Sequence, residues 1–85
     1  MKVQAEISLY PLREHELAMP IQQFIRALKN NNLDIRTGAM STLVTGESRV
    51  VFESLQKAFE GLAEVYEVVM TAKISNACPE VNMDK

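Results

Sequence analysis

The sequence predicts an α+β fold in which four strands and two helices follow one another in the order β-α-β-β-α-β. Three observations support this prediction. Segments near both ends of the 85-residue chain alternate apolar and polar residues, as half-buried strands do. Two longer segments repeat apolar residues at the spacing of an amphipathic helix. Between these two segments, the stretch TGAMSTLVTGE is rich in threonine and glycine and has the composition of a hairpin.

The first strand is predicted over residues 3–12, VQAEISLYPL, because its residues alternate strictly. We expect Pro11 to end this strand, since proline cannot donate a hydrogen bond to a neighbouring strand. Residues 13–19, REHELAM, are expected to form a loop. The predicted core face of the strand consists of Val3, Ala5, Ile7 and Leu9, and the opposite face consists of Gln4, Glu6, Ser8 and Tyr10.

The first helix is predicted to begin at Pro20, because the first turn of a helix does not need the N–H group that proline lacks. The three asparagines at positions 30–32 are expected to end the helix, since asparagine tolerates the left-handed conformation of a C-cap. The apolar stripe that should face the core consists of Ile21, Phe24, Ile25 and Leu28.

Two short strands are predicted next, over residues 33–38 and 41–46. Only Ala39 and Met40 separate them, so the two strands should pair as an antiparallel hairpin. Gly46 is expected to close the second of these strands.

A second helix is predicted to begin at Glu47 or Ser48, with acidic charge near the positive end of the helix dipole. Gly61 should weaken its last turn. The expected buried stripe of this helix consists of Val51, Leu55, Phe59 and Leu62. The last strand is predicted over residues 65–75, with Val68, Met70, Ala72 and Ile74 on one face and Glu67, Val69, Thr71, Lys73 and Ser75 on the other.

Right-handed crossovers turn two β-α-β units into a four-stranded antiparallel sheet with both helices on one face, the ferredoxin-like sandwich. We expect a single domain over residues 1–80 and a polar tail over residues 81–85. The helix-free face of the sheet mixes polar and apolar side chains. A chain this short is marginally stable alone, so we expect that face to pack against another subunit and to form a homo-oligomer.

Composition excludes several classes of protein. The net charge of −2 and the pI of about 5.3 argue against a nucleic-acid partner, which calls for a basic face. No apolar run approaches 18 residues, and the first residues lack the apolar region of a signal peptide, so we expect no membrane association. The chain has one cysteine and one histidine, which excludes an internal disulfide and predicts no metal site. A lone cysteine also fits a reducing compartment, so we predict a cytoplasmic protein.

Several familiar sites are also missing from the sequence. The predicted strand 41–46 lacks the stacking aromatic residues of an RNA-recognition sheet, and no phosphate-binding glycine loop with its lysine is present. We interpret His15 as a solvated loop residue. Cys78 has no obvious basic neighbour to activate it as a nucleophile, so we interpret it as structural, with contact to a ligand as the alternative.

Hydroxyl, amide and glycine residues concentrate near strand ends and turns. We expect Ser8, Thr42 and Asn76 to converge on one small cavity, with Met40 in the core or on the cavity floor. Such groups suit a small polar heterocycle, because hydroxyls and amides contact the ring edge and glycine permits close approach. The alternative is that these residues only form turns and caps. The three segments concerned are SLYP at 8–11, TGAMST at 37–42 and SNACP at 75–79.

Four motifs, taken together, resemble the small thiamine-binding protein family, which was long known only as a conserved domain of unknown function. They are AEISLYPL, PIQQFI, TGAMST followed by VTGE, and KISNACP. The similarity covers about residues 1–80 in the family's order and spacing. The resemblance implies one ferredoxin-like unit, assembly into dimers or tetramers, and non-catalytic binding of thiamine (vitamin B1) or its hydroxymethylpyrimidine half.

The resemblance also implies which residues hold the ligand. No further cofactor and no metal are implied. Two alternatives stay open: a small oligomeric enzyme and a regulatory module that senses another cyclic metabolite. The three short segments SLYP, TGAMST and SNACP contain no histidine or carboxylate that could serve as a catalytic acid or base, which speaks against the enzyme. The ligand-binding residues implied are Ser8, Tyr10, Thr37, Gly38, Met40, Ser41, Thr42 and Asn76.

Overall fold

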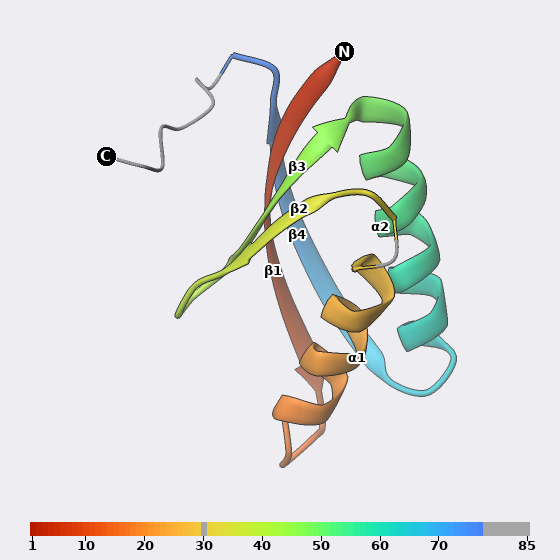
Figure 1. The fold of residues 1–85 in the computed structure, drawn as a ribbon. Helices are drawn as coiled ribbons and strands as arrows, with labels where there is room; N and C mark the ends of the chain where they lie inside the picture. Colours follow the sequence, from red (N-terminus) through yellow and green to blue (C-terminus); the bar gives the residue numbers. More distant parts are fainter. Residues whose placement is uncertain (30, 78–85) are drawn as a thin grey trace.

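The computed structural model describes residues 1–29 and 31–77, and these residues have the predicted α+β ferredoxin-like fold (Figure 1). The four strands form one antiparallel sheet in the order β2-β3-β1-β4, and both helices cover the same face. The predictions for Asn30, Cys78 and the tail 81–85 lie outside the described residues. The elements are β1 (Lys2–Leu12), α1 (Ala18–Leu28), β2 (Asp34–Thr37), β3 (Thr42–Glu47), α2 (Ser48–Ala63) and β4 (Glu67–Ser75).

Strand β1 lies inside the sheet, between β3 and β4. Ala5 pairs with Val44 of β3 on one side and with Ile74 of β4 on the other. Paired residues share a face of the sheet, so the alternation of β1 carries over to its neighbours. This confirms both the core face of β1 and the two faces predicted for β4. The buried apolar core consists of Val3, Ala5, Ile7, Phe24, Leu28, Val44, Val51, Leu55, Ala58 and Leu62.

The prediction that Pro11 ends β1 is wrong, because the strand runs to Leu12. Strand β3 pairs with β1 only as far as Ile7, and beyond that point the described strand pairs of β1 are with β4 alone. A proline on the unpaired side of a strand breaks no hydrogen bond. An ion pair between Arg13 and Glu67 then joins the end of β1 to the start of β4.

Helix α1 begins at Ala18, two residues before the predicted start. Pro20 is therefore the third helical residue, where its missing N–H group still costs nothing, since the first four N–H groups of a helix have no partner within it. At the other end the helix stops at Leu28. Asn32 has a left-handed φ of 58°, and the Asn31 side chain donates to the Ala27 carbonyl oxygen at 3.0 Å, so asparagines do form the turn after the helix.

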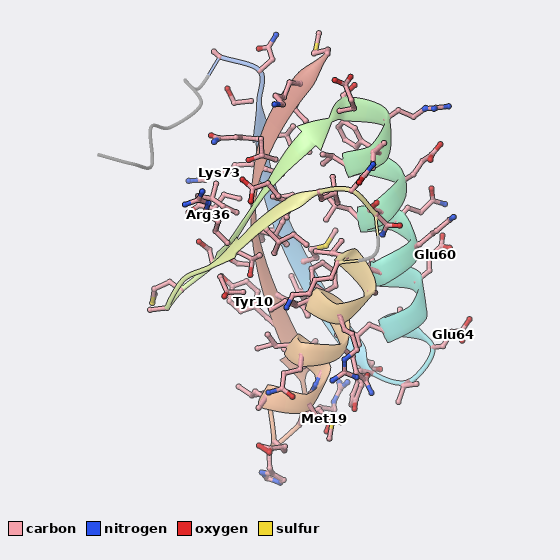
Figure 2. All side chains as sticks on the ribbon, viewed as in Figure 1. Tyr10, Met19, Arg36, Glu60, Glu64 and Lys73 are labelled. Carbon is pink, nitrogen blue, oxygen red and sulfur yellow. The ribbon has the colours of Figure 1, made fainter. Side chains whose placement is uncertain are left out.

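Helix α2 buries Val51, Leu55 and Leu62 as predicted, but Phe59 is only half-buried. Ala58 takes the core position instead, because a stripe with a period of 3.6 residues drifts from the simple spacing of four. The acidic side chains of this helix are solvated, and Figure 2 shows Glu60 and Glu64 on its outer surface.

The two helices differ in how they meet the sheet. Helix α2 packs against β1, β3 and β4, whereas α1 packs chiefly against α2. Side chains of α1 such as Phe24 and Leu28 still reach the core. As a result, the space between α1 and the β2–β3 hairpin is less completely filled than the space under α2. Among the described residues, neither helix has the length and apolar character that crossing a membrane requires.

Candidate functional site

The β2–β3 hairpin turns at Ala39 and Met40, as predicted. The Gly38 N–H group donates to the Ser41 carbonyl oxygen at 2.8 Å and closes the turn. Gly38 does not have a positive φ, so the turn does not need glycine for its backbone angles. A Cβ atom at position 38 would lie 3.3 Å from the Ser41 carbonyl oxygen, which is unusually close. Glycine therefore suits this position because the backbone at residue 38 lies very close to the backbone at Ser41.

Two serine side chains join this hairpin to the middle of β1. The Ser41 hydroxyl donates to a carboxylate oxygen of Glu6 at 3.0 Å, and the Ser8 hydroxyl donates to the Met40 carbonyl oxygen at 3.4 Å. Glu6 and Ser8 alternate with the core residues of β1, so both side chains belong to the helix-free face. The serine hydroxyls thus hold the hairpin in place from that side of the sheet.

Two threonines lie on the other side of the hairpin. Thr37 pairs with Thr42, and Thr42 pairs with the buried Ile7, so both threonines share the face that the helices cover. Within the part of the chain that is described, neither threonine hydroxyl makes a side-chain hydrogen bond. Both hydroxyls are therefore free to donate to, or accept from, a bound molecule.

A cavity of about 210 Å³ lies between α1, the hairpin and the middle of β1. Apolar side chains of β1 and α1 form much of its wall, and hairpin residues complete it. It brings together six of the eight residues that the resemblance implies. Its lining consists of Ile7, Ser8, Leu9, Ile21, Phe24, Ile25, Thr37, Gly38, Ala39, Met40, Ser41 and Thr42.

The expectation that Met40 is a core or floor residue is wrong. Its side chain is 87% exposed at the tip of the hairpin, so it forms part of the rim. The tip extends beyond the edge of the helix layer, and therefore no element covers it (Figure 1).

The two remaining residues implied as ligand contacts do not join this cavity. Tyr10 lies on the helix-free face beside Val69. Ser75 pairs with Gln4, which lies four residues, or about 14 Å at roughly 3.4 Å per residue, along β1 from Ser8. Asn76 follows Ser75 and so lies beyond that level. The expectation that Asn76 shares one cavity with Ser8 and Thr42 is therefore wrong, because β4 runs antiparallel to β1 and carries its end away from the hairpin.

Ser75 supports the alternative interpretation for its own segment. The Ala77 N–H group donates to the Ser75 hydroxyl oxygen at 2.9 Å, which is a local turn contact. No cluster of three potential metal ligands occurs among residues 1–29 and 31–77.

Sequence reasoning missed the α1 side of the cavity. Ile21 and Ile25 belong to the predicted core stripe, and periodicity assigns such residues to packing. In the structure both are half-buried and line the cavity. Ile21 and Ile25 line a cavity rather than the packed core because α1 lies at a distance from the hairpin. The residue pattern of α1 cannot predict that distance.

The fold and the cavity together define a single ferredoxin-like unit with a small, mainly apolar pocket beside a hydroxyl-rich hairpin. Residues 2–81 match the YKOF-related family, and the chain therefore belongs to that family. No curated protein matches the chain.

Several solved structures share the fold. A hypothetical protein from Methanocaldococcus jannascii is 25% identical, with a TM-score of 0.83 over 95% of this chain and 86% of its own. A Thermotoga maritima protein provisionally assigned to thiamine biosynthesis or salvage is 21% identical, with a TM-score of 0.80 over 88% of this chain and 83% of its own. A domain of unknown function from Bacillus cereus is 21% identical, with a TM-score of 0.77 over 99% of this chain and 85% of its own. At 21% identity, these last two likenesses show the fold alone.

Proposed function

We propose that this protein is a non-catalytic, cytoplasmic binding protein for thiamine or its hydroxymethylpyrimidine moiety. The observation that carries the proposal is the cavity between α1 and the hairpin, which gathers six of the eight implied ligand-contact residues in one place. The provisional assignment of the Thermotoga maritima protein to thiamine biosynthesis or salvage gives further support. The single cysteine of the sequence favours a reducing compartment.

The size and chemistry of the cavity suit one aminopyrimidine ring. Its volume of about 210 Å³ is smaller than the roughly 300–1,000 Å³ of pockets that enclose drug-sized ligands, so a single ring fits better than a two-ring molecule. Ile7, Phe24 and Ile25 would contact the ring faces. The free hydroxyls of Thr37 and Thr42 would contact the polar edge of the ring, which both donates and accepts hydrogen bonds.

The lining of the cavity favours binding over chemistry. It consists of apolar, hydroxyl-bearing and glycine residues, and none of them is a carboxylate, a histidine or a lysine. Proton transfer at a substrate needs an acid or base within hydrogen-bond reach. Our proposal therefore assigns no catalytic residue.

Calorimetry with thiamine and with hydroxymethylpyrimidine tests the proposal. We expect saturable heat and a higher melting temperature, since a ligand that binds only the folded state stabilises it. Thr42→Val should weaken binding by about fivefold, the effect of losing one hydrogen bond of about 1 kcal/mol. Thr45→Val is the matched control, because Thr45 lies on the same strand and pairs with Gln4 of the helix-free face. No heat and no thermal shift at millimolar ligand would refute the proposal.

We also propose that the protein assembles as a dimer or tetramer through the helix-free face. Tyr10, Leu12 and Val69 are 51%, 42% and 45% exposed, and they lie together near one end of this face. Arg36 and Lys73 lie on the same side of the sheet, away from the helices (Figure 2). Exposed apolar side chains with a charged surround are typical of a subunit interface.

Replacing Val69 with lysine tests the assembly. We expect Val69→Lys to lower the sedimentation mass, since it places a charge in the centre of the apolar group. Val65→Lys is the control, because Val65 is 72% exposed and precedes β4 rather than lying on the sheet. An unchanged mass for Val69→Lys would show that the subunits meet elsewhere.

A further inference from the structure

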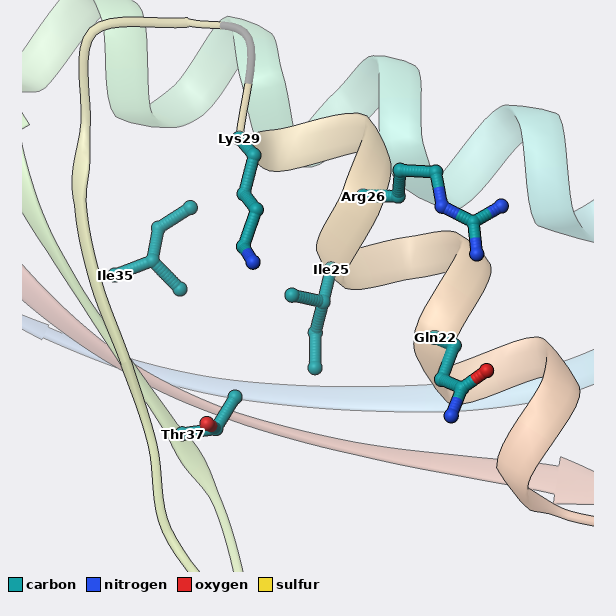
Figure 3. A pocket seen from close by; sticks show the side chains of 6 residues that line it. All are labelled: Gln22, Ile25, Arg26, Lys29, Ile35 and Thr37. Carbon is teal, nitrogen blue, oxygen red and sulfur yellow. The ribbon is translucent and has the colours of Figure 1, made fainter.

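A second cavity lies on the other side of Ile25 and Thr37. It has a volume of about 350 Å³ and lies between the last two turns of α1 and strand β2 (Figure 3). Ile25 and Thr37 line both this cavity and the first one, so the two cavities adjoin each other, and we call the pair of them the groove. The complete lining is Gln22, Ile25, Arg26, Lys29, Ile35 and Thr37.

This second cavity differs from the first in its charge. Lys29 extends into the space between Ile25 and Ile35, while Arg26 leaves α1 on the side away from β2 (Figure 3). Within the described part of the chain, neither cation forms an ion pair. The nearby Asp34 approaches Arg36 at 3.8 Å, and these two residues alternate with Ile35 and so lie on the helix-free face of β2. The second cavity therefore has positive charge without a neutralising carboxylate in its lining.

We infer that the second cavity binds a phosphate group, and that the preferred ligand of the groove is a phosphate monoester of the pyrimidine. This inference rests on the proposed function, because the ring would occupy the first cavity. The phosphate would accept charge-assisted hydrogen bonds from Lys29, with Thr37 and Gln22 as neutral donors. In a hydroxymethyl phosphate, only a few bonds separate the phosphate group from the ring. This short separation suits a ring in the first cavity and a phosphate in the adjoining second cavity.

The same charge disfavours intact thiamine. Its thiazolium ring is a cation, and in the second cavity it would meet the Lys29 ammonium group at close range. Like charges repel each other, so a neutral or anionic substituent is preferred there. The groove thereby discriminates between the two ligands named in the proposed function.

Calorimetric titration of the intact protein with hydroxymethylpyrimidine, its phosphate ester and thiamine tests this inference. We expect the ester to bind about tenfold more tightly than the alcohol at low salt, and the advantage to shrink as salt is raised. Lys29→Gln should remove most of this advantage and leave the affinity for the alcohol unchanged. Arg26→Gln should have a smaller effect, because its guanidinium lies farther from β2. Lys57→Gln, an equal change of charge on α2, should keep the full advantage.

The outcomes separate this inference from the proposed function. If the alcohol binds but the ester binds no better, or if the ester keeps its advantage in Lys29→Gln, the phosphate site is refuted and the pyrimidine site stands. If thiamine binds more tightly than the ester, the phosphate site is likewise refuted. If none of the three ligands binds, the proposed function fails and the phosphate site fails with it.

Discussion

The two helices of this small sandwich perform different tasks. Helix α2 packs against β1, β3 and β4 and contributes four of the ten buried apolar residues of the core. Helix α1 packs chiefly against α2, and both cavities of the proposed groove lie on its hairpin side. Ile21 and Ile25 occupy regular positions in its apolar stripe but are only half-buried.

This difference shows how one fold can be both stable and open. The second half of the chain supplies close packing under most of the sheet, which is where burial stabilises most. In the first half of the chain, α1 does not pack closely against β2. The space left between them could hold a ligand. We therefore expect substitutions under α2 to change mainly stability, and substitutions beside α1 to change mainly binding.

The largest expected effect is that of Leu55→Ala. Leu55 is buried in the α2 core, so its truncation should lower the free energy of unfolding by about 2–5 kcal/mol. Ile25→Ala should cost less, about 1 kcal/mol, because the side chain is already half-exposed, yet it should weaken ligand binding because it removes a wall of both cavities. Urea unfolding at one protein concentration, together with calorimetry, compares the two. Equal losses of stability would contradict the division between the helices.

A smaller effect is expected at the glycines. Gly61 of α2 has nothing within 4 Å of a Cβ atom, so Gly61→Ala should raise the free energy of unfolding by about 0.5–1 kcal/mol. At Gly46 the same atom would lie 2.6 Å from the Leu33 side chain, which would have to move. Gly46→Ala should therefore lower the melting temperature while Gly61→Ala raises it. A decrease for Gly61→Ala would mean that its neighbourhood is less open than described.

The smallest expected effect concerns the residue before α2. The hydrogen bond from the Met1 ammonium group to Glu47 (2.9 Å), and then its positive charge, lower the pKa of the Glu47 carboxyl below its ordinary value of 4.5. A lowered folded-state pKa stabilises the fold above the unfolded-state pKa, and this contribution is lost as the pH falls through the folded-state value.

The difference in unfolding free energy between the wild type and Glu47→Gln should therefore be present at pH 7 and decrease below about pH 4.5. The pair is solvent-exposed, so added salt should also reduce the difference. Urea unfolding at several pH values measures it. A difference that grows on acidification would contradict the assigned direction of the pKa shift.

Most of the fold could be predicted from the sequence because its signals are local. The strict alternation of β1 and the short link between the two predicted strands 33–38 and 41–46 predict a strand and a hairpin without knowledge of distant contacts. The error at Pro11 has a non-local cause, because the proline is tolerated only since β3 stops pairing with β1 at Ile7. The error at Phe59 is local, because the predicted stripe kept a spacing of four where the helical period of 3.6 residues places Ala58 in the core.

The candidate site could be predicted only in part. The hairpin residues converge with Ser8 because β1 and β3 are neighbours, which the topology already implies. Asn76 was expected at the same place, but the antiparallel register carries it to the other end of β1. Lys29 gave no signal in the sequence, since a lysine just after a helix is usually solvated.

By itself, the sequence determined which residues face inward, because periods of 2 and 3.6 residues are properties of short segments. It also determined the order of the elements, and with it the layout of the sheet. Only the tertiary structure decided that α1 lies against α2 rather than close to β2, since that position results from many side chains packing at once. The groove beside α1, its neutral and positive ends, and the separation of Asn76 from it all follow from this arrangement.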